Sequence, residues 1–79
     1  MEKSIYGQKQ AALTTRLVAA RRGARMTQQM VADRLGKPQS FVAKYEGGER
    51  RLDVVEFIAV AQALGISSLD ILAEIIEAS

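Results

Sequence analysis

The chain has 79 residues, and 48% of them are apolar, a composition typical of one small packed domain rather than of a disordered segment. Cysteine and histidine are both absent, which excludes a disulfide framework, thiolate catalysis and the commonest metal ligand. No apolar run reaches the roughly 20 residues that span a bilayer, and the N-terminus carries no apolar signal-peptide core. We therefore expect a cytoplasmic protein with no cofactor, no metal and no membrane partner.

The net charge is only +2, but the charged residues are divided unevenly along the chain. Residues 1–52 contain all 11 lysines and arginines against four acids, a balance of +7, whereas residues 53–79 contain five acids and no base, a balance of −5. A small domain with a basic front and an acidic back would turn one particular face toward a polyanion. The alternative is a chance segregation of solvated charges.

Five helices and no strands are expected, because the chain has one proline, few alternating β-branched residues and no hairpin signal. The first helix is predicted over residues 8–22, with Leu13, Leu17 and Ala20 on its buried side. Residues 1–7 would then form an N-terminal extension, and residues 8–79 a single domain.

Two short helices joined by a tight turn are predicted over residues 28–46. Thr27 is the expected N-cap of the first helix, and Gly36 ends that helix in the left-handed conformation. The second helix begins at Pro38 or the next residue and is stopped after Glu46 by two glycines. Each helix has apolar residues at i, i+1 and i+4, which marks one buried face: Val31, Ala32 and Leu35, then Phe41, Val42 and Tyr45. This arrangement is typical of a helix-turn-helix, which points to DNA.

A basic loop at residues 49–52 is predicted to lead into two further helices. The fourth helix begins after Asp53 as its N-cap and ends at Gly65, and four of its residues are expected to point inward: Phe57, Val60, Ala61 and Leu64. Ser67 and Asp70 resemble a capping box, which opens a fifth helix over residues 68–78.

The fifth helix carries more apolar residues than one neighbouring helix can cover. We expect Leu69, Leu72 and Ile76 to enter the core, which leaves three other residues partly exposed: Ile71, Ile75 and, on the fourth helix, Ile58. A leftover apolar strip of this kind favours a symmetric homodimer with those three residues at the interface. The alternative interpretation is that the strip only closes the core.

The start of the second helix in the motif carries side chains suited to reading base edges in the major groove of double-stranded DNA. Gln39 can pair with adenine N6 and N7, Ser40 is permissive, and Lys44, about one turn further, favours guanine. Phe41 has two interpretations: contact with a thymine methyl if the ring is partly exposed, or ordinary core packing.

Residues on both sides of this helix are expected to contact DNA phosphates. Thr27 and Gln28 lie at a helix N-terminus, where free backbone amides and the helix dipole attract an anion. Lys37 in the turn, with Arg50 and Arg51 in the basic loop, would contact the backbone on the other side of the groove. Such contacts set register and supply affinity without reading sequence.

Glu46 would repel phosphates if it faced DNA, so we expect it to face inward. Arg21 lies one residue past the apolar stripe of the first helix, and its guanidinium can reach the end of the helix that carries Glu46. The sequence therefore predicts a structural ion pair between Arg21 and Glu46, whose disruption would leave a buried charge.

These residues resemble the phage-repressor/Cro-like, Xre-type helix-turn-helix regulators, and the resemblance covers roughly residues 13–75. Its most specific stretches are Met26-Thr27-Gln28, residues 31–36, residues 38–51 and residues 61–66. The opening Ser4-Ile5-Tyr6 is similar to short bacterial members that consist of this domain alone.

The resemblance implies an all-α, compact five-helix, lambda-repressor-like domain that binds an approximately palindromic operator as a dimer, with its third helix in the major groove. It also implies DNA contacts at Gln28, Gln39, Ser40 and Lys44. Arg25 departs from the family pattern, which has glycine at that position. Either Gly23 ends the first helix early, or Arg25 takes a positive φ at a cost of roughly 1 kcal/mol or more.

The leading hypothesis is a sequence-specific transcriptional regulator, most simply a repressor that occludes a promoter. The alternative is a protein-interaction module or antitoxin-type regulator whose acidic, apolar C-terminal part docks a partner protein. An enzyme is disfavoured because without histidine or cysteine the acids look like helix caps and solvated faces rather than a convergent pair.

Overall fold

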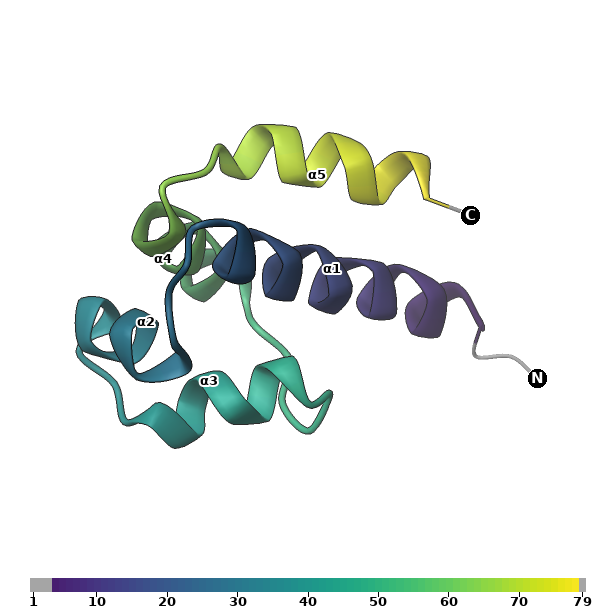
Figure 1. Ribbon diagram of the computed structural model, residues 1–79. Helices are drawn as coiled ribbons and strands as arrows, with labels where there is room; N and C mark the ends of the chain where they lie inside the picture. Colours follow the sequence, from purple (N-terminus) through teal and green to yellow (C-terminus); the bar gives the residue numbers. More distant parts are fainter. Residues whose placement is uncertain (1–3, 79) are drawn as a thin grey trace.

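The computed structural model describes the backbone of residues 4–78 and the side chains of residues 7–78, and it consists of five α-helices (Figure 1). The helices are α1 (Ser4–Gly23), α2 (Gln28–Leu35), α3 (Gln39–Glu46), α4 (Val54–Leu64) and α5 (Ser68–Glu77). No strand occurs in the described part of the chain. The predicted all-α, five-helix architecture is therefore confirmed.

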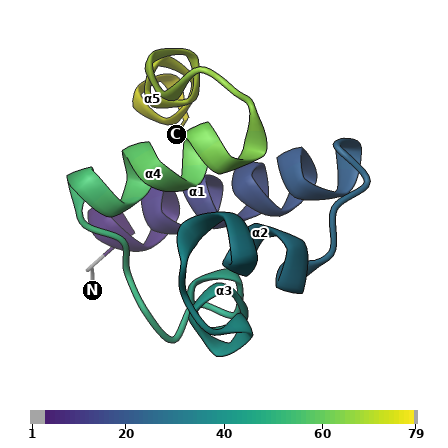
Figure 2. The ribbon, with the colours of Figure 1, turned by 90° about the vertical axis from the view of Figure 1, so that its left-hand side faces the viewer.

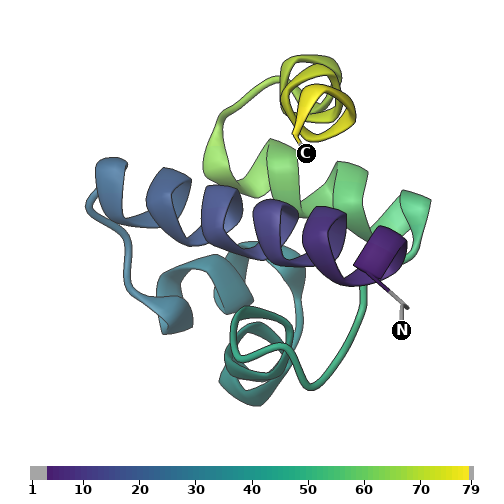
Figure 3. The ribbon, with the colours of Figure 1, turned by 90° about the vertical axis from the view of Figure 1, so that its right-hand side faces the viewer.

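Helix α1 crosses the middle of the molecule, with α3 along one edge and α5 along the opposite edge (Figure 1). The two side views keep this order, with α5 above and α3 below α1 (Figure 2 and Figure 3). Helix α3 packs on α2 and α1, and α4 joins the two ends of the fold through contacts with α2, α1 and α5. Helix α3, from the basic part of the sequence, and α5, from the acidic part, thus lie at opposite edges of the domain.

Helix α1 begins at Ser4, earlier than the predicted start at Gln8. Residues 4–7, assigned to the N-terminal extension, therefore belong to α1, while residues 1–3 lie outside the described residues. The prediction depended on apolar periodicity, and none of residues 7–12 of α1 is fully buried. Helix α5 ends at Glu77, one residue before the predicted end.

The caps of the central helices follow the sequence signals. The Thr27 side chain accepts a hydrogen bond from the Met30 amide (3.1 Å), and Gly36 ends α2 with φ 67°. Asp53 accepts from the Glu56 amide at the start of α4 (2.7 Å), and Gly65 ends that helix with φ 73°. Ser67 caps α5 through the Asp70 amide, without the reciprocal bond that a full capping box would have.

The turn between α1 and α2 resolves the question raised by Gly23 and Arg25. Helix α1 runs through Gly23, and Arg25 adopts φ 58°, the only positive φ of a non-glycine residue in the described chain. The Met26 amide donates to the Arg21 carbonyl (3.1 Å), which closes the end of α1. A side chain in this left-handed conformation costs roughly 1 kcal/mol or more.

The core lies where α1, α2, α3 and α4 meet, and α5 covers one side of it. Its most completely buried large side chains are Leu17, Val31, Val42, Val60 and Ile71. The predicted inward residues of α4, namely Phe57, Val60, Ala61 and Leu64, are all buried. Each of the five helices contributes to this single core, so none of them is an appended element.

The orientation of α5 is opposite to the prediction. Ile71 is 1% exposed and Ile75 packs against the core, whereas Leu69, Leu72 and Ile76 are 76%, 43% and 70% exposed. The helix has two apolar stripes, one with Ile71 and Ile75 and one with Leu69, Leu72 and Ile76. The packing of α5 on α1 buries the stripe of Ile71 and Ile75. Ile71 is therefore a core residue and is not available to an interface.

Candidate nucleic-acid interface

The start of α3 is exposed while its rear face is anchored in the core. Gln39, Ser40 and Lys44 are exposed, and Val42 and Tyr45 are buried. Burial raises the pKa of the Tyr45 hydroxyl to about 12, so this side chain stays neutral in its apolar environment. The three residues predicted to read bases therefore share the outward side of a firmly seated helix.

A partly buried ion pair joins the end of α1 to the end of α3, as the sequence predicted. Arg21 donates from Nε to Glu46 Oε2 (2.7 Å) and from Nη2 to Glu46 Oε1 (3.0 Å), and the two side chains are 12% and 7% exposed. Arg21 Nη1 also donates to the Met26 carbonyl (2.9 Å). Hydrogen bonding to Glu46 raises the pKa of Arg21 above its ordinary value. The bidentate geometry holds α3 in one position relative to α1.

Two glutamines that the sequence treated separately are joined in the structure. Gln28 Nε2 donates to Glu46 Oε1 (2.9 Å), and Gln39 Nε2 donates to Gln28 Oε1 (2.6 Å). The first residue of α2 is thereby linked to the first residue of α3 and to the buried ion pair. Sequence reasoning missed this link because Gln28 and Gln39 are separated by a turn and share no helical face.

Arg50, predicted as a phosphate contact, is engaged within the protein. Its Nη1 and Nη2 atoms donate to the Glu56 carboxylate (2.9 and 2.7 Å), and Nη1 also donates to the Arg51 carbonyl (2.9 Å). Hydrogen bonds from Arg50 and from the Asp53 amide lower the pKa of Glu56 to about 2. Glu56 was not singled out in the sequence, although its position three residues after Asp53 is that of a capping-box acid.

Phe41 is partly exposed and packs against the edge of the core, so it combines features of both sequence interpretations. Its ring meets that of Tyr45 edge-on, with 5.7 Å between centroids. The Arg50 guanidinium carbon lies 4.7 Å from the Phe41 centroid, and Lys37 Nζ lies 5.6 Å away. The partly exposed ring is thus bordered by two cations.

The other predicted phosphate contacts are accessible. Thr27, Lys37 and Arg51 are exposed, and the Thr27 oxygen also serves as the helix cap described above. The partly buried Gln28 side chain hydrogen-bonds to Glu46 through its nitrogen and to Gln39 through its oxygen. An anion at this helix N-terminus would therefore be bound by the Gln28 backbone amide.

Comparison with known proteins agrees with this geometry. The helix-turn-helix family matches residues 17–72 of the chain. The structure is similar to that of an XRE-family like protein from Pseudomonas syringae pv. tomato str. DC3000, with a TM-score of 0.89 and 42% identity over 92% of this chain and 89% of that chain. The chain belongs to the XRE family of helix-turn-helix regulators.

A second solved structure, that of the clp gene regulator ClgR from Corynebacterium glutamicum, has a TM-score of 0.77 and covers 86% of this chain and 88% of that chain. At 24% identity it supports the five-helix fold alone. No curated protein sequence matches the chain significantly. As a member of the XRE family, the protein is a DNA-binding transcriptional regulator rather than an enzyme.

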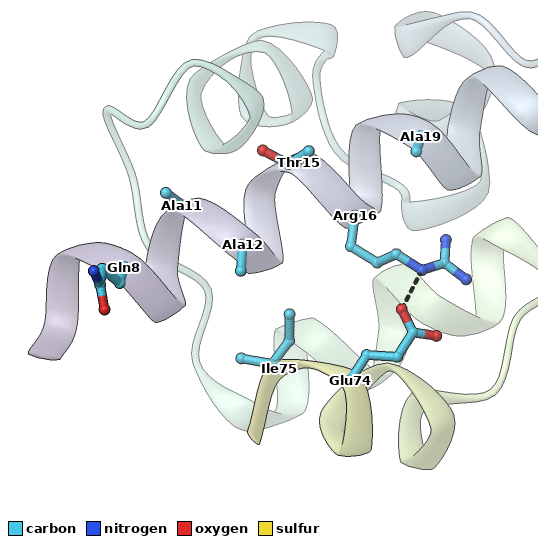
Figure 4. Close-up of a pocket in the computed structure, with 8 residues that line it drawn as sticks. All are labelled: Gln8, Ala11, Ala12, Thr15, Arg16, Ala19, Glu74 and Ile75. Atoms are coloured by element: carbon cyan, nitrogen blue, oxygen red, sulfur yellow. Dashed lines mark hydrogen bonds and ion pairs between the residues drawn. The ribbon is translucent and has the colours of Figure 1, made fainter. Parts of the chain in front are cut away.

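The opposite edge of this XRE domain is held by contacts that sequence reasoning did not find. Arg16 of α1 donates from Nε to Glu74 Oε1 of α5 (2.8 Å; Figure 4). Lys9 Nζ donates to two carbonyls in the last turn of α5, those of Ile75 and Ile76 (3.1 and 3.0 Å), and to the carbonyl of the C-cap residue Ala78 (2.9 Å). A cation at the C-terminal end of a helix also complements the helix dipole.

Helices α1 and α5 border an open hollow. Its α1 side is lined by small side chains: Ala11, Ala12, Thr15 and Ala19. Ile75 points toward this wall from α5 (Figure 4).

In the described part of the XRE domain, no cluster of three or more acids lies close enough together to hold a metal ion. No single described helix is long and apolar enough to cross a bilayer; α4 and α5 reach that composition only together, across a 116° bend.

Proposed function

We propose that the protein is a repressor that binds a palindromic operator as a homodimer, with α3 inserted into the major groove. The observation that carries this proposal is the state of α3: its leading side chains are exposed, while Val42, Tyr45 and the Arg21–Glu46 pair anchor its rear and its end. A helix presented in this way can enter the groove without a rearrangement of the domain.

Base reading is assigned to Gln39, Ser40 and Lys44 at the start and outward side of α3. Gln39 suits adenine, Lys44 suits guanine O6 or N7, and the partly exposed edge of Phe41 suits a thymine methyl. Alanine at both Gln39 and Lys44 should abolish sequence preference while helicity and melting temperature stay near wild type. Full operator affinity in that double variant would contradict base reading by α3.

Phosphate contacts are assigned to two flanks of the same helix. Thr27 and the backbone amide of Gln28 form one flank, and Lys37 and Arg51 form the other. Arg50 contributes to the second flank mainly by holding Phe41 and the loop after α3, since Glu56 already occupies its guanidinium. These contacts supply affinity and register rather than sequence discrimination.

The homodimer interface is assigned to the exposed apolar stripe of α5, which replaces the stripe chosen from the sequence. Leu69, Leu72 and Ile76 are exposed at helical spacing, and Ile58 of α4 is also exposed. Apolar stripes of this kind favour an isologous contact with a second copy. Sedimentation equilibrium should show a dimer for the wild-type protein and a monomer for Leu72→Glu.

A partner protein is the alternative occupant of the α5 stripe. In that case the purified wild-type chain would stay monomeric, and Leu72→Glu would leave both its mass and its operator affinity unchanged. A dimer that dissociates in Leu72→Glu, with loss of cooperative binding to a two-half-site operator, would support the homodimer instead.

Repression in the cytoplasm would follow from occlusion of the promoter by the bound dimer. Two recognition helices about 34 Å apart would occupy one face of the duplex. Selection of binding sites from random duplexes with the purified protein would return the half-site, its symmetry and its spacing. A reporter promoter that carries the selected site should be silenced by the wild-type protein; increased transcription would contradict a repressor role.

A further inference from the structure

A second hollow lies between α1 and the loop that follows α3. The loop passes beneath α1 (Figure 1), and the space between them has a volume of about 370 Å³. Gln10 and Thr14 line this space from α1, and Gly47, Gly48 and Arg51 line it from the loop. We call it the α1–loop hollow. It begins where α3 ends, so it lies beside the helix that is proposed to enter the major groove.

The α1 side of this hollow offers two polar side chains. Gln10 and Thr14 are four residues apart, which places them on one face of α1, and both are partly buried. Among the described residues, the side-chain hydrogen bonds of α1 come from Lys9, Arg16 and Arg21. The Gln10 amide and the Thr14 hydroxyl are therefore available to a ligand.

The loop side supplies a positive charge on a backbone that is held in place. The Arg51 side chain is exposed, while its backbone carbonyl accepts a hydrogen bond from Arg50 Nη1 (2.9 Å). Arg50 in turn donates two hydrogen bonds to the Glu56 carboxylate, which anchors the loop to α4. The loop therefore presents the Arg51 guanidinium to the hollow from a fixed point.

Glu46 also lines the hollow, but its carboxylate is already engaged. Its Oε2 atom accepts from Arg21 Nε (2.7 Å), and its Oε1 atom accepts from Arg21 Nη2 and Gln28 Nε2 (3.0 and 2.9 Å). Because the Arg21 guanidinium balances this carboxylate, Arg51 leaves the hollow with a net positive charge. The hollow thus combines a guanidinium, an amide and a hydroxyl, which are the kinds of donor that contact DNA phosphates. The two glycines of the loop allow a sugar–phosphate backbone to approach closely.

We propose that Gln10, Thr14 and Arg51 together bind one DNA phosphate, which makes α1 part of the nucleic-acid interface. The proposal rests on the phosphate contact assigned to Arg51 above. Lys37 precedes the first residue of α3 and the hollow follows its last, so eight residues of helix, about 12 Å, separate the two positions. That separation exceeds the rise of about 3.4 Å per nucleotide, so the hollow binds a different phosphate from Lys37.

Two uncharged substitutions test the α1 side of the site. Gln10→Ala removes the amide, and Thr14→Val replaces the hydroxyl by a methyl group of similar size. Gln8→Ala is the matched control, because Gln8 is the same residue type on the same helix but lines the hollow beside α5 instead.

The measurement is the dissociation constant for the selected operator and for a series of duplexes in which one phosphate at a time is replaced by an uncharged methylphosphonate. Gln10→Ala and Thr14→Val should each weaken binding to the unmodified operator by about 2- to 10-fold, the range of one hydrogen bond, while Gln8→Ala binds like the wild type. One methylphosphonate should weaken the wild-type protein and cost less in Gln10→Ala, Thr14→Val and Arg51→Ala, because the contact is already lost. The slope of log Kd against log salt should keep its wild-type value in the two uncharged variants and decrease in Arg51→Ala.

The dependence on one phosphate separates a direct contact from an effect on the fold. A fraction of unfolded protein raises every dissociation constant by the same factor and cancels between duplexes. If Gln10→Ala and Thr14→Val bind like Gln8→Ala, or lose the same factor on every duplex, the α1 site is overturned and the Arg51 contact stands. If Arg51→Ala changes neither the affinity nor the salt slope, the proposed phosphate contact itself fails.

Discussion

The two edges of the domain differ in how tightly their sequence determines their structure. In α2 and α3 the buried residues lie on one face of each helix, and the turn between the helices is delimited by Gly36 and Pro38. In α5 apolar residues occupy two faces, and no cap or turn distinguishes the stripe of Ile71 from the stripe of Leu72. The buried face of a helix can be predicted from sequence when one face is apolar and the opposite face is polar. A high apolar content alone does not predict it.

The same comparison separates the polar contacts of the two edges. The helix-turn-helix edge contains a buried ion pair with short, bidentate geometry, while the α1–α5 edge is held by Arg16–Glu74, whose side chains are more exposed. An exposed pair contributes about 0–1 kcal/mol, whereas removing one partner of a buried pair costs about 3–5 kcal/mol.

Salt should weaken operator binding by several powers of ten, because a homodimer neutralises several phosphates. For about 6–10 contacts the affinity falls by about 10³–10⁵ between about 50 and 200 mM salt. Lys37→Ala and Arg51→Ala should each reduce the slope of log Kd against log salt by about 1 per subunit. Arg50→Ala should weaken binding with little change in slope, since Glu56 already neutralises it. A flat salt profile for the wild-type protein would contradict the assigned phosphate contacts.

Arg21→Ala should destabilise the domain by about 3–5 kcal/mol, because Glu46 would be left as a buried charge without its partner. Arg22→Ala, on the exposed side of the same turn of α1, is the matched control and should change stability by less than about 0.5 kcal/mol. Chemical denaturation of the two variants gives the comparison. Equal unfolding midpoints would refute a stabilising role for the pair.

Ile71→Ala should lower the free energy of unfolding by about 2–5 kcal/mol, since this side chain on the inner face of α5 is 1% exposed. Leu69→Ala, two residues earlier on the exposed stripe, should change it by less than about 0.5 kcal/mol in the monomer. Thermal unfolding at a protein concentration below the dissociation constant of the dimer measures the stability of both variants. The reverse ranking would mean that the α5 orientation first expected from the sequence is correct after all.

Arg25→Gly should stabilise the fold by up to about 1 kcal/mol, because glycine adopts the positive φ of this position without strain. Part of the gain is offset by the greater freedom of glycine in the unfolded chain. Arg22→Gly, inside the last turn of α1, is the control and should cost about 1 kcal/mol. A lower denaturation midpoint for Arg25→Gly than for wild type would show that the Arg25 side chain makes a compensating contact.

Acid should remove the contribution of the Arg50–Glu56 pair. The pKa of Glu56 is lowered to about 2 in the folded protein from 4.5, so the pair stabilises fully above about pH 4.5. This stability is lost as the pH falls from 4.5 through 2, where the folded state must also take up the proton. Melting temperatures of wild type and Glu56→Gln should therefore converge in that interval. A difference that stays constant down to pH 2 would exclude this pair as the cause.

Local signals were sufficient for most of the fold and for the exposed residues at the start of α3. Thr27, Gly36 and Asp53 mark helix ends through short-range chemistry, so those boundaries could be placed without a structure. Arg21 and Glu46 could be paired because an acid beside DNA requires an internal partner. The engagement of Arg50 by Glu56 was missed, because a cation in a loop has the same sequence signature whether it is free or paired.

The amino-acid sequence alone determined the helix-turn-helix, its caps and the exposed side chains at the start of its second helix, since these depend on neighbours within one or two turns. Only the tertiary structure decided which stripe of α5 is buried, that Arg25 takes the left-handed position, and that Gln39 is held by Gln28 and Glu46. These features depend on distances between residues far apart in the chain. Such distances are set by the packing of all five helices together and leave no periodic trace in the sequence.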